Sequence, residues 1–156
     1  MVGIGYDIHQ LKQGETLILG GVNFETEFGT VAHSDGDVLL HSIMDAILGA
    51  ASLGDIGEHF PDNNEYFRNI SSLELLKNVI KLIDEKYFIV NIDATLIAEK
   101  PKIKDLKNKM RENIAKACNI SIHQINIKAT TNEKLGAVGR GEGIAAIAIC
   151  QLEKKY

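Results

Sequence analysis

The stretch His33-Ser-Asp-Gly-Asp-Val-Leu-Leu-His41 leads directly into Ser42-Ile-Met-Asp-Ala-Ile-Leu-Gly-Ala-Ala51, and these residues decide the fold. Polar residues typical of a loop give way to apolar residues at helical spacing, which predicts a helix from about Asp35. Ser34 or Asp35 can cap this helix, and Ser34 with Asp37 forms a capping-box pattern. Its apolar residues cover most of the circumference and predict a buried helix: Val38, Leu39, Leu40, Ile43, Met44, Ile47 and Leu48.

A polar stripe interrupts this apolar helix, because Asp37, His41 and Asp45 recur at spacings of four residues. Burying a carboxylate or an imidazole without a partner is costly, so the stripe requires a metal ion, a ligand or another chain. The free N–H groups at the start of the helix also form a site suited to an anion. We therefore expect function to lie near this helix.

Composition and charge limit the class of protein. The chain has 156 residues, 45% of them hydrophobic and 24% charged, which is typical of a single globular domain over residues 1–156. Its net charge of −4 argues against nucleic acid as a partner. Cys118 and Cys150 lack C-x-x-C spacing and are expected as buried free thiols. Since neither a leader pattern nor a membrane-spanning apolar run is apparent, we expect a cytoplasmic protein without a membrane partner.

The rest of the chain alternates between strand and helix patterns. Strands are predicted over residues 2–8, 88–98 and 124–130, with a last strand that ends near residue 152. Residues 17–19 and 22–24 are predicted to form a hairpin joined by Gly20-Gly21. Further helices are predicted from Ser71 or Ser72 and over residues 103–118, whereas residues 52–70 are expected to form a loop. This order favours an α+β fold, a two-layer α/β sandwich with a mixed β-sheet on one side and helices on the other.

Asp7 and His9 stand at the end of the first predicted strand, where residues two apart point to the same side. Together with His41 they offer two imidazoles and a carboxylate. This donor set suits zinc and leaves a fourth position for water or a substrate oxygen. The alternative is that the histidines are ordinary surface and core residues. Asp45, one turn beyond His41, is either a partner that orients an imidazole or a helix-surface carboxylate.

A second polar stretch, Thr130-Thr-Asn-Glu-Lys134, directly follows a predicted strand. Its hydroxyls, backbone N–H groups and single carboxylate can hold phosphates and a hard cation such as Mg²⁺, although an ordinary polar turn has the same composition. The glycine-rich residues 136–143 contain Arg140, which can reach an anion, but they do not form a P-loop. His59 and His123 have no partner at ligand spacing and are expected at the surface.

The motifs occur in a fixed order along the chain: Gly5-x-Asp-x-His9, Ala32-His-Ser-Asp-Gly-Asp-x-x-x-His41, Leu53-Gly-Asp-Ile-Gly-x-x-Phe-Pro-Asp62, Pro101-Lys102, Lys128-Ala-Thr-Thr-x-Glu-Lys-Leu-Gly136 and Gly139-Arg-Gly-Glu-Gly143. In this order and over the whole chain, the sequence resembles the 2-C-methyl-D-erythritol 2,4-cyclodiphosphate synthases of the non-mevalonate isoprenoid pathway. It is similar to the stand-alone enzyme, because no room exists for a fused cytidylyltransferase domain.

The resemblance implies a fold, an assembly and a reaction. The protomer is expected to be a chorismate-mutase-like sandwich, three copies of which form a homotrimer with active sites between neighbouring subunits. The enzyme is expected to be a metal-dependent lyase that converts 4-diphosphocytidyl-2-C-methyl-D-erythritol 2-phosphate, a cytidine diphosphate substrate, to the 2,4-cyclodiphosphate and CMP. The alternatives are a zinc-dependent phosphodiesterase, in which water attacks instead, and a non-catalytic trimeric nucleotide-binding sensor with structural zinc.

The resemblance also implies roles for individual residues. It places Zn²⁺, one ion per subunit, on Asp7, His9 and His41, and Mg²⁺ or Mn²⁺ on Glu133. The catalytic residues that it implies are His33, Thr131 and Glu133. The substrate-binding residues that it implies are Asp7, His9, His33, Ser34, Asp55, Gly57, Asp62, Ala98, Lys102, Ile103, Thr130, Thr131 and Arg140.

These binding residues divide by the part of the substrate that they match in the family. His33 and Ser34 match contacts to the reacting phosphate, and the residues over 55–62 match the pocket around the erythritol part. Thr130 and Thr131 match diphosphate contacts, whereas the residues over 98–103 match the rim that binds cytosine.

One position departs from the family pattern. Ala137 stands where the family usually has a phenylalanine that lines an apolar cavity at the trimer axis, beside the position of Arg140. A methyl group in place of a ring would widen that cavity or change its occupant.

Overall fold

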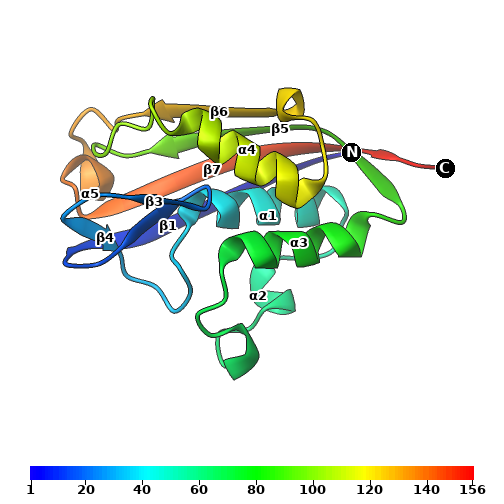
Figure 1. The fold of residues 1–156 in the computed structure, drawn as a ribbon, viewed down its shortest axis with the longest axis horizontal. Coiled ribbons are helices and arrows are strands. Elements are labelled where there is room, and N and C mark those ends of the chain that lie inside the picture. The colour runs from blue at the N-terminus through cyan, green and yellow to red at the C-terminus, as the bar shows by residue number, and fades with distance from the viewer.

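A computed structural model describes residues 1–156 and has a β-sheet with helices packed on one of its faces (Figure 1). Along the chain the elements are β1 (Val2–Gln13), β2 (Leu17–Leu19), β3 (Val22–Phe24), β4 (Phe28–Thr30), α1 (Val38–Ala50), α2 (Ile56–His59), η1 (Glu65–Phe67), α3 (Ser72–Ile83), β5 (Tyr87–Ile97), α4 (Lys107–Cys118), η2 (Ile122–Gln124), β6 (Ile125–Thr130), α5 (Gly136–Gly139) and β7 (Gly143–Lys154). The main sheet has five strands in the order β4-β1-β7-β5-β6, and among neighbouring strands only the pair β5 and β6 is parallel. The predicted mixed α+β fold is therefore confirmed.

Helix α1 lies at the centre of the core, where it packs on β1 and β7, and the apolar residues predicted for its circumference are all fully buried. It begins at Val38, later than predicted, and its N-cap is Asp37, whose carboxylate accepts the N–H of Leu40 at 3.1 Å. The predicted capping box of Ser34 and Asp37 is therefore wrong. Asp37 is the cap itself, and it also occupies the helix start that we predicted as an anion site.

The predicted hairpin is confirmed, and it explains why Asp37 can be buried. Strands β2 and β3 are joined by Gly20 and Gly21, which both have the positive φ values (57° and 73°) that a two-residue turn requires. Their N–H groups donate to the two carboxylate oxygens of Asp37, at 3.0 and 2.8 Å. The partner that the polar stripe required at this position is therefore a turn of the same chain.

Strand β1 and helix α1 lie unusually close together because two glycines face the helix. A Cβ atom on Gly5 would overlap the backbone oxygen of Ser42, and one on Gly3 would overlap the backbone of Ala46 and Ala50. The close contact brings the end of β1 next to the first turn of α1. This packing positions the candidate site.

The structure corrects several predicted boundaries. Strand β1 continues to Gln13, well beyond residue 8, and α4 begins at Lys107. The segment over residues 52–70, predicted as a loop, contains the short helices α2 and η1. In β5 a bulge shifts the register between Ile89 and Asn91, so that Ile89 is buried.

On the sheet face opposite the helices, the part formed by β1 and the adjacent side of β7 is apolar and uncovered. Along β1 its exposed side chains alternate with those that face α1: Val2 (67% exposed), Ile4 (64%), Tyr6 (56%) and Ile8 (45%). Ile149 on β7 is 45% exposed and pairs with Ile4 across the two strands.

No helix has the length and apolar character needed to cross a membrane. Cys118 and Cys150 are free and buried, as predicted.

Candidate active site

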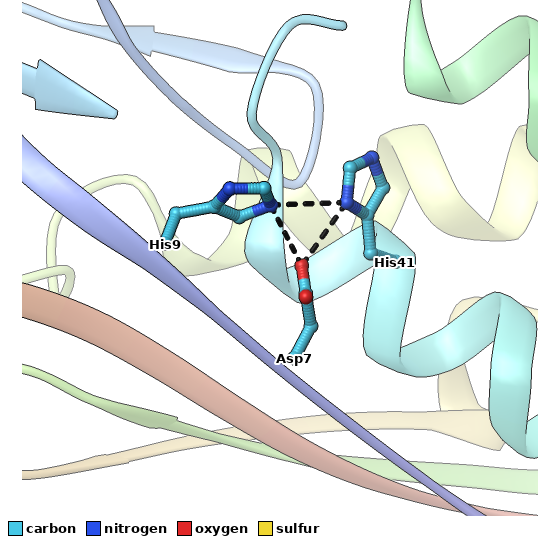
Figure 2. A group of neighbouring side chains, drawn as sticks. All are labelled: Asp7, His9 and His41. Atoms are coloured by element: carbon cyan, nitrogen blue, oxygen red, sulfur yellow. Dashed lines mark hydrogen bonds and ion pairs between the residues drawn. The ribbon is translucent and has the colours of Figure 1, made fainter. Parts of the chain in front are cut away.

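Three potential metal ligands meet where β1 approaches α1 (Figure 2). Asp7 and His9 project from the same side of β1, and His41 comes from the first turn of α1. Oδ2 of Asp7 lies 2.8 Å from Nε2 of His9 and 3.0 Å from Nδ1 of His41. The two ring nitrogens are 3.3 Å apart. The sequence prediction that these residues form one group is therefore correct.

The geometry of this group fits a zinc ion. A tetrahedral ion with bonds of ~2.0–2.2 Å holds its ligand atoms about 3.3–3.6 Å apart, and the three atoms need to separate only slightly to reach that spacing. Two imidazole nitrogens and a carboxylate oxygen are also the donor types that zinc takes. Three protein ligands leave a fourth position for a substrate oxygen. The ring of His9 meets that of His41 edge-on, with centroids 5.4 Å apart.

The electrostatics of the group favour a cation. Burial by itself would raise the pKa of Asp7, but hydrogen bonds from His41 and His9 outweigh it and lower that pKa to about 2. Burial would likewise lower the pKa of His41, but the Asp7 carboxylate beside it raises that pKa overall. Asp7 is therefore an anion at neutral pH. It draws positive charge, a proton or a metal ion, between itself and the two rings.

A cavity of about 540 Å³ opens beside this group. It is lined by His9 and His41, and four predicted contact residues also line it: His33, Ser34, Gly57 and Asp62. Asp55 does not line it but caps α2, where its Oδ1 accepts the N–H of Glu58 at 3.0 Å. The structure thus brings the predicted phosphate and erythritol contacts together at one cavity.

Two kinds of residue at this cavity escaped the sequence analysis. Arg68 lines it and carries a guanidinium, the kind of cationic group that pairs with phosphate. Phe60 and Phe67 also line it, and their rings meet edge to face with centroids 5.2 Å apart. Phe60 belongs to the motif over residues 53–62 but was assigned no role, and Phe67 and Arg68 lie beyond the end of that motif.

Six of the remaining predicted site residues form a second group at or just beyond the ends of β5 and β6. The N–H of Ala98 donates to the carbonyl of Thr130 at 3.0 Å, which aligns the two strand ends. Ala98 and Ile103 are buried, whereas the other members are exposed: Lys102, Thr130, Thr131 and Glu133. None of the six lines the cavity beside the metal ligands. Within the single chain the predicted site is therefore divided in two.

The turn that carries Glu133 has an uncommon backbone. Glu133 and Lys134 both adopt positive φ values, 51° and 62°, which side chains with a Cβ atom rarely take. Oγ1 of Thr131 accepts the N–H of Glu133 at 3.2 Å, and Oε1 of Glu99 accepts that of Lys134 at 2.8 Å. These contacts hold the loop in place and leave the carboxylate of Glu133 exposed.

Arg140 lies apart from both groups. It lines a separate cavity of about 370 Å³ together with Leu11, Phe28 and Lys100. Its guanidinium forms an ion pair with Glu142, with N–O distances of 3.1 Å. The prediction that Arg140 contacts the same substrate as His33 thus finds no support within a single protomer.

Asp45 has neither of the roles that we weighed for it. Its Oδ1 accepts the N–H of Ile56 at 2.8 Å, so it holds the start of α2 against α1. Burial raises its pKa. Of the two histidines expected at the surface, His123 is exposed and His59 is half-buried, with its Nε2 2.7 Å from the carbonyl oxygen of Leu53.

Fold and site together define an α+β protein with a candidate metal-binding group beside a cavity lined largely by polar residues. The comparisons with known proteins identify it more closely: the chain belongs to the YgbB family, whose sequence profile matches residues 1–153. It is 57% identical over 154 residues to the 2-C-methyl-D-erythritol 2,4-cyclodiphosphate synthase of Alkaliphilus oremlandii, covering 98% of each chain.

Solved structures give the same assignment. The bifunctional IspDF of Campylobacter jejuni matches with a TM-score of 0.94 and 46% identity over 99% of this chain, which spans only 42% of the length of that protein. IspF of Plasmodium falciparum, solved as a CDP complex, matches with a TM-score of 0.87 and 39% identity, covering 99% of this chain and 96% of that one.

Proposed function

We propose that this protein is a 2-C-methyl-D-erythritol 2,4-cyclodiphosphate synthase, which cyclises 4-diphosphocytidyl-2-C-methyl-D-erythritol 2-phosphate and releases CMP. The observation that carries the proposal is the Asp7–His9–His41 group beside a polar cavity in a chain of this family. The CDP bound by the Plasmodium falciparum relative supports a cytidine nucleotide as part of the substrate.

The reaction needs little acid–base chemistry from the protein. The 2-phosphate is already ionised when it attacks the β-phosphorus, and CMP leaves as the bond to the α-phosphate breaks. Catalysis then depends on positioning the two phosphates and neutralising their charge. We infer that His33 and Ser34 hold the reacting phosphate, because both line the cavity next to His9 and His41. Arg68 supplies a further positive charge there.

Two metal ions would supply the remaining positive charge. Zn²⁺ on Asp7, His9 and His41 would polarise a phosphate oxygen, and Mg²⁺ or Mn²⁺ on Glu133 would neutralise the diphosphate. The exposed carboxylate of Glu133 suits a hard cation that also binds substrate phosphates. We assign Thr130 and Thr131 to the diphosphate, with Thr131 stabilising the transition state.

We further propose that each complete site lies between two subunits of a homotrimer. The cytidine and diphosphate residues form a group separate from the metal ligands of the same protomer. That group would serve the metal site of a neighbouring chain, with Ala98, Lys102 and Ile103 around the cytosine. The apolar sheet face that carries Ile4 and Ile149 supports the assembly, since exposed apolar patches mark interaction surfaces. Arg140 would then lie near the trimer axis, away from the reacting phosphates.

A turnover assay with the substrate, Zn²⁺ and Mg²⁺ tests the reaction. We expect CMP and the cyclic diphosphate as products. CMP with a linear 2,4-bisphosphate, the product of attack by water, would instead indicate a phosphodiesterase, and the absence of turnover would indicate a nucleotide-binding sensor. His41→Ala should lose both zinc and turnover while it keeps its helical circular dichroism. His123→Ala, which removes an exposed imidazole outside the site, is the matched control and should keep both.

A further inference from the structure

Nε2 of His41, the ring nitrogen that faces away from Asp7 and His9, contacts the side chain of Ser72, which in turn contacts Asp35. The proposed reaction uses neither Ser72 nor Asp35. Nδ1 points at Asp7, whereas Nε2 lies 3.0 Å from Oγ of Ser72, a fully buried residue at the start of α3. Oγ of Ser34 lies farther from the same nitrogen, at 3.4 Å. The principal partner of this nitrogen is therefore a hydroxyl on another helix.

The hydroxyl of Ser72 is in turn held by Asp35. Ser72 Oγ donates to Asp35 Oδ1 at 2.5 Å, and Ser72 N donates to Asp35 Oδ2 at 2.8 Å. Asp35 Oδ1 also accepts the N–H of Asp37, at 3.2 Å. The carboxylate thus joins the loop before α1 to the first residue of α3, next to the cavity-lining residues His33 and Ser34.

The direction of these hydrogen bonds determines the tautomer of His41. A serine hydroxyl has one proton, and here Ser72 donates it to the carboxylate of Asp35. Its oxygen can therefore only accept a hydrogen bond from Nε2 of His41, which places the ring proton on Nε2. Nδ1, the atom that faces Asp7 and His9, is then the nitrogen whose lone pair becomes free when a metal ion takes the place of the proton between it and Asp7.

We propose that Asp35 and Ser72 are positioning residues of the metal centre, which hold His41 in the tautomer and orientation that bind the ion. The inference rests on the proposed function only in that a divalent metal occupies the Asp7–His9–His41 group. Partners of this kind typically change metal affinity 10- to 100-fold when they are removed. Because Asp35 also belongs to the loop that carries His33, the same hydrogen bonds align the metal with the residues assigned to the reacting phosphate.

The decisive variant is Ser72→Ala, which removes the hydroxyl but keeps the backbone N–H that Asp35 accepts. Its matched control is Ser42→Ala. Ser42 is also fully buried and adjoins His41 in sequence, but its hydroxyl donates only to the carbonyl of Leu39, at 2.8 Å. We expect Ser72→Ala to raise the Kd for Zn²⁺ about 10- to 100-fold, measured by competition with a chromophoric chelator, and Ser42→Ala to leave it within threefold.

A second variant, Asp35→Asn, reverses the direction of the hydrogen bonds between residue 35, Ser72 and His41. In Asp35→Asn the side-chain oxygen can still accept the N–H of Ser72, and the amide NH₂ then donates to Ser72 Oγ. The hydroxyl of Ser72 must in turn donate to Nε2 of His41, so the ring proton of His41 moves to Nδ1. Asp35→Asn should therefore weaken Zn²⁺ binding at least as much as Ser72→Ala. In the double variant, Asp35→Asn should raise the Kd for Zn²⁺ less than threefold above that of Ser72→Ala alone, because the effects of residues that act through one chain of contacts are not additive.

The absorption spectrum of the Co²⁺-loaded protein reports ligand geometry directly. It should shift in Ser72→Ala and Asp35→Asn but not in Ser42→Ala, and circular dichroism of the metal-free variants shows whether they fold. A Kd for Zn²⁺ that changes less than fivefold in Ser72→Ala, or equally in Ser42→Ala, would overturn the proposal. If the unaltered protein bound no zinc at all, the proposed metal centre itself would be wrong, so the two failures are distinguishable.

Discussion

At the scale of single residues, Asp37 shows how one buried carboxylate can join two elements. It accepts the N–H groups of Gly20, Gly21 and Leu40, and it is completely buried. Burial raises the pKa of Asp37 to about 6, against the opposing effect of these backbone N–H groups, of which that of Gly21 is the strongest. The side chain therefore ties the β2–β3 hairpin to the start of α1 at the cost of burying a charge.

This pKa predicts how stability depends on pH. Between about pH 4 and pH 6 the folded protein holds a proton on Asp37 that the unfolded chain has released, so the contribution of this group is present below pH 4 and is lost as the pH rises through 6. Asn at this position has no charge to bury. The free energy of unfolding of the native protein relative to Asp37→Asn should therefore fall by about 2 kcal/mol from pH 4.5 to pH 7.5.

Urea denaturation of both proteins, with a chelator present to keep them metal-free, measures this difference. Asp84→Asn removes a carboxylate that is exposed on the surface and serves as the control, with a difference that stays nearly constant over the same range. A difference that rises with pH would mean that the charged form of Asp37 is the favoured one in the folded protein.

At the scale of elements, the contact between β1 and α1 does most to build the site. It brings two ligands that are two residues apart on a strand to a third ligand on a helix, 32 residues later in the chain. Glycine at positions 3 and 5 permits the contact, because any side chain there would meet the helix backbone. A strand and a helix held at that distance form a rigid support for a metal centre.

We therefore expect Gly5→Ala to be severely destabilising. Its Cβ would meet the backbone oxygen of Ser42, which cannot move without displacing α1, and overpacking of this kind costs about 1–3 kcal/mol or more. Gly49→Ala is the control on the other side of the same contact. The nearest atoms to a Cβ there lie 3.9 Å away, so the substitution should be neutral or stabilise α1 by up to about 1 kcal/mol. Gly5→Ala should have a lower midpoint of thermal unfolding than Gly49→Ala. Equal midpoints would contradict the packing argument.

At the scale of the whole molecule, the uncovered sheet face and the divided site have a common explanation in the proposed trimer. Ile4→Lys places a charge on that face, next to Ile149, and should separate the subunits. Each chain should keep its zinc, because the ligands lie on the opposite face of β1. Leu82→Lys changes a similarly exposed apolar residue on α3 and should leave the assembly intact. Sedimentation equilibrium measures the mass: a native mass near the 17.1 kDa of one chain would exclude the trimer.

Mixing two inactive variants tests whether the site is shared. Suppose that each site takes its zinc ligands from one subunit and Glu133 from the next around a closed ring. Random refolding of His41→Ala with Glu133→Gln in equal amounts makes about three-quarters of the trimers mixed, each with one intact site, so activity should recover to roughly a quarter of native. Neither variant should recover when it is refolded alone. If both parts of the site belonged to one chain, the mixture would stay inactive.

Much of this protein is determined by local sequence. The apolar pattern that follows Asp35 predicts the central helix, Gly20-Gly21 predicts the hairpin, and Asp7-x-His9 predicts two side chains on one face of a strand. These predictions succeed because periodicity and turn chemistry depend on neighbouring residues. The proposed metal ligands follow from the same local patterns together with the family motifs.

Only the tertiary structure decides which distant groups meet. Asp37 finds its partners 16 and 17 residues earlier in the chain, Asp35 holds Ser72 across 37 residues, and Arg68 reaches the cavity from a segment without a motif. The same holds for the division of the predicted site into two groups. Periodicity states that a side chain is buried, but not what it is buried against. That choice is made when whole elements pack, because the free energy of burial depends on every residue at the contact.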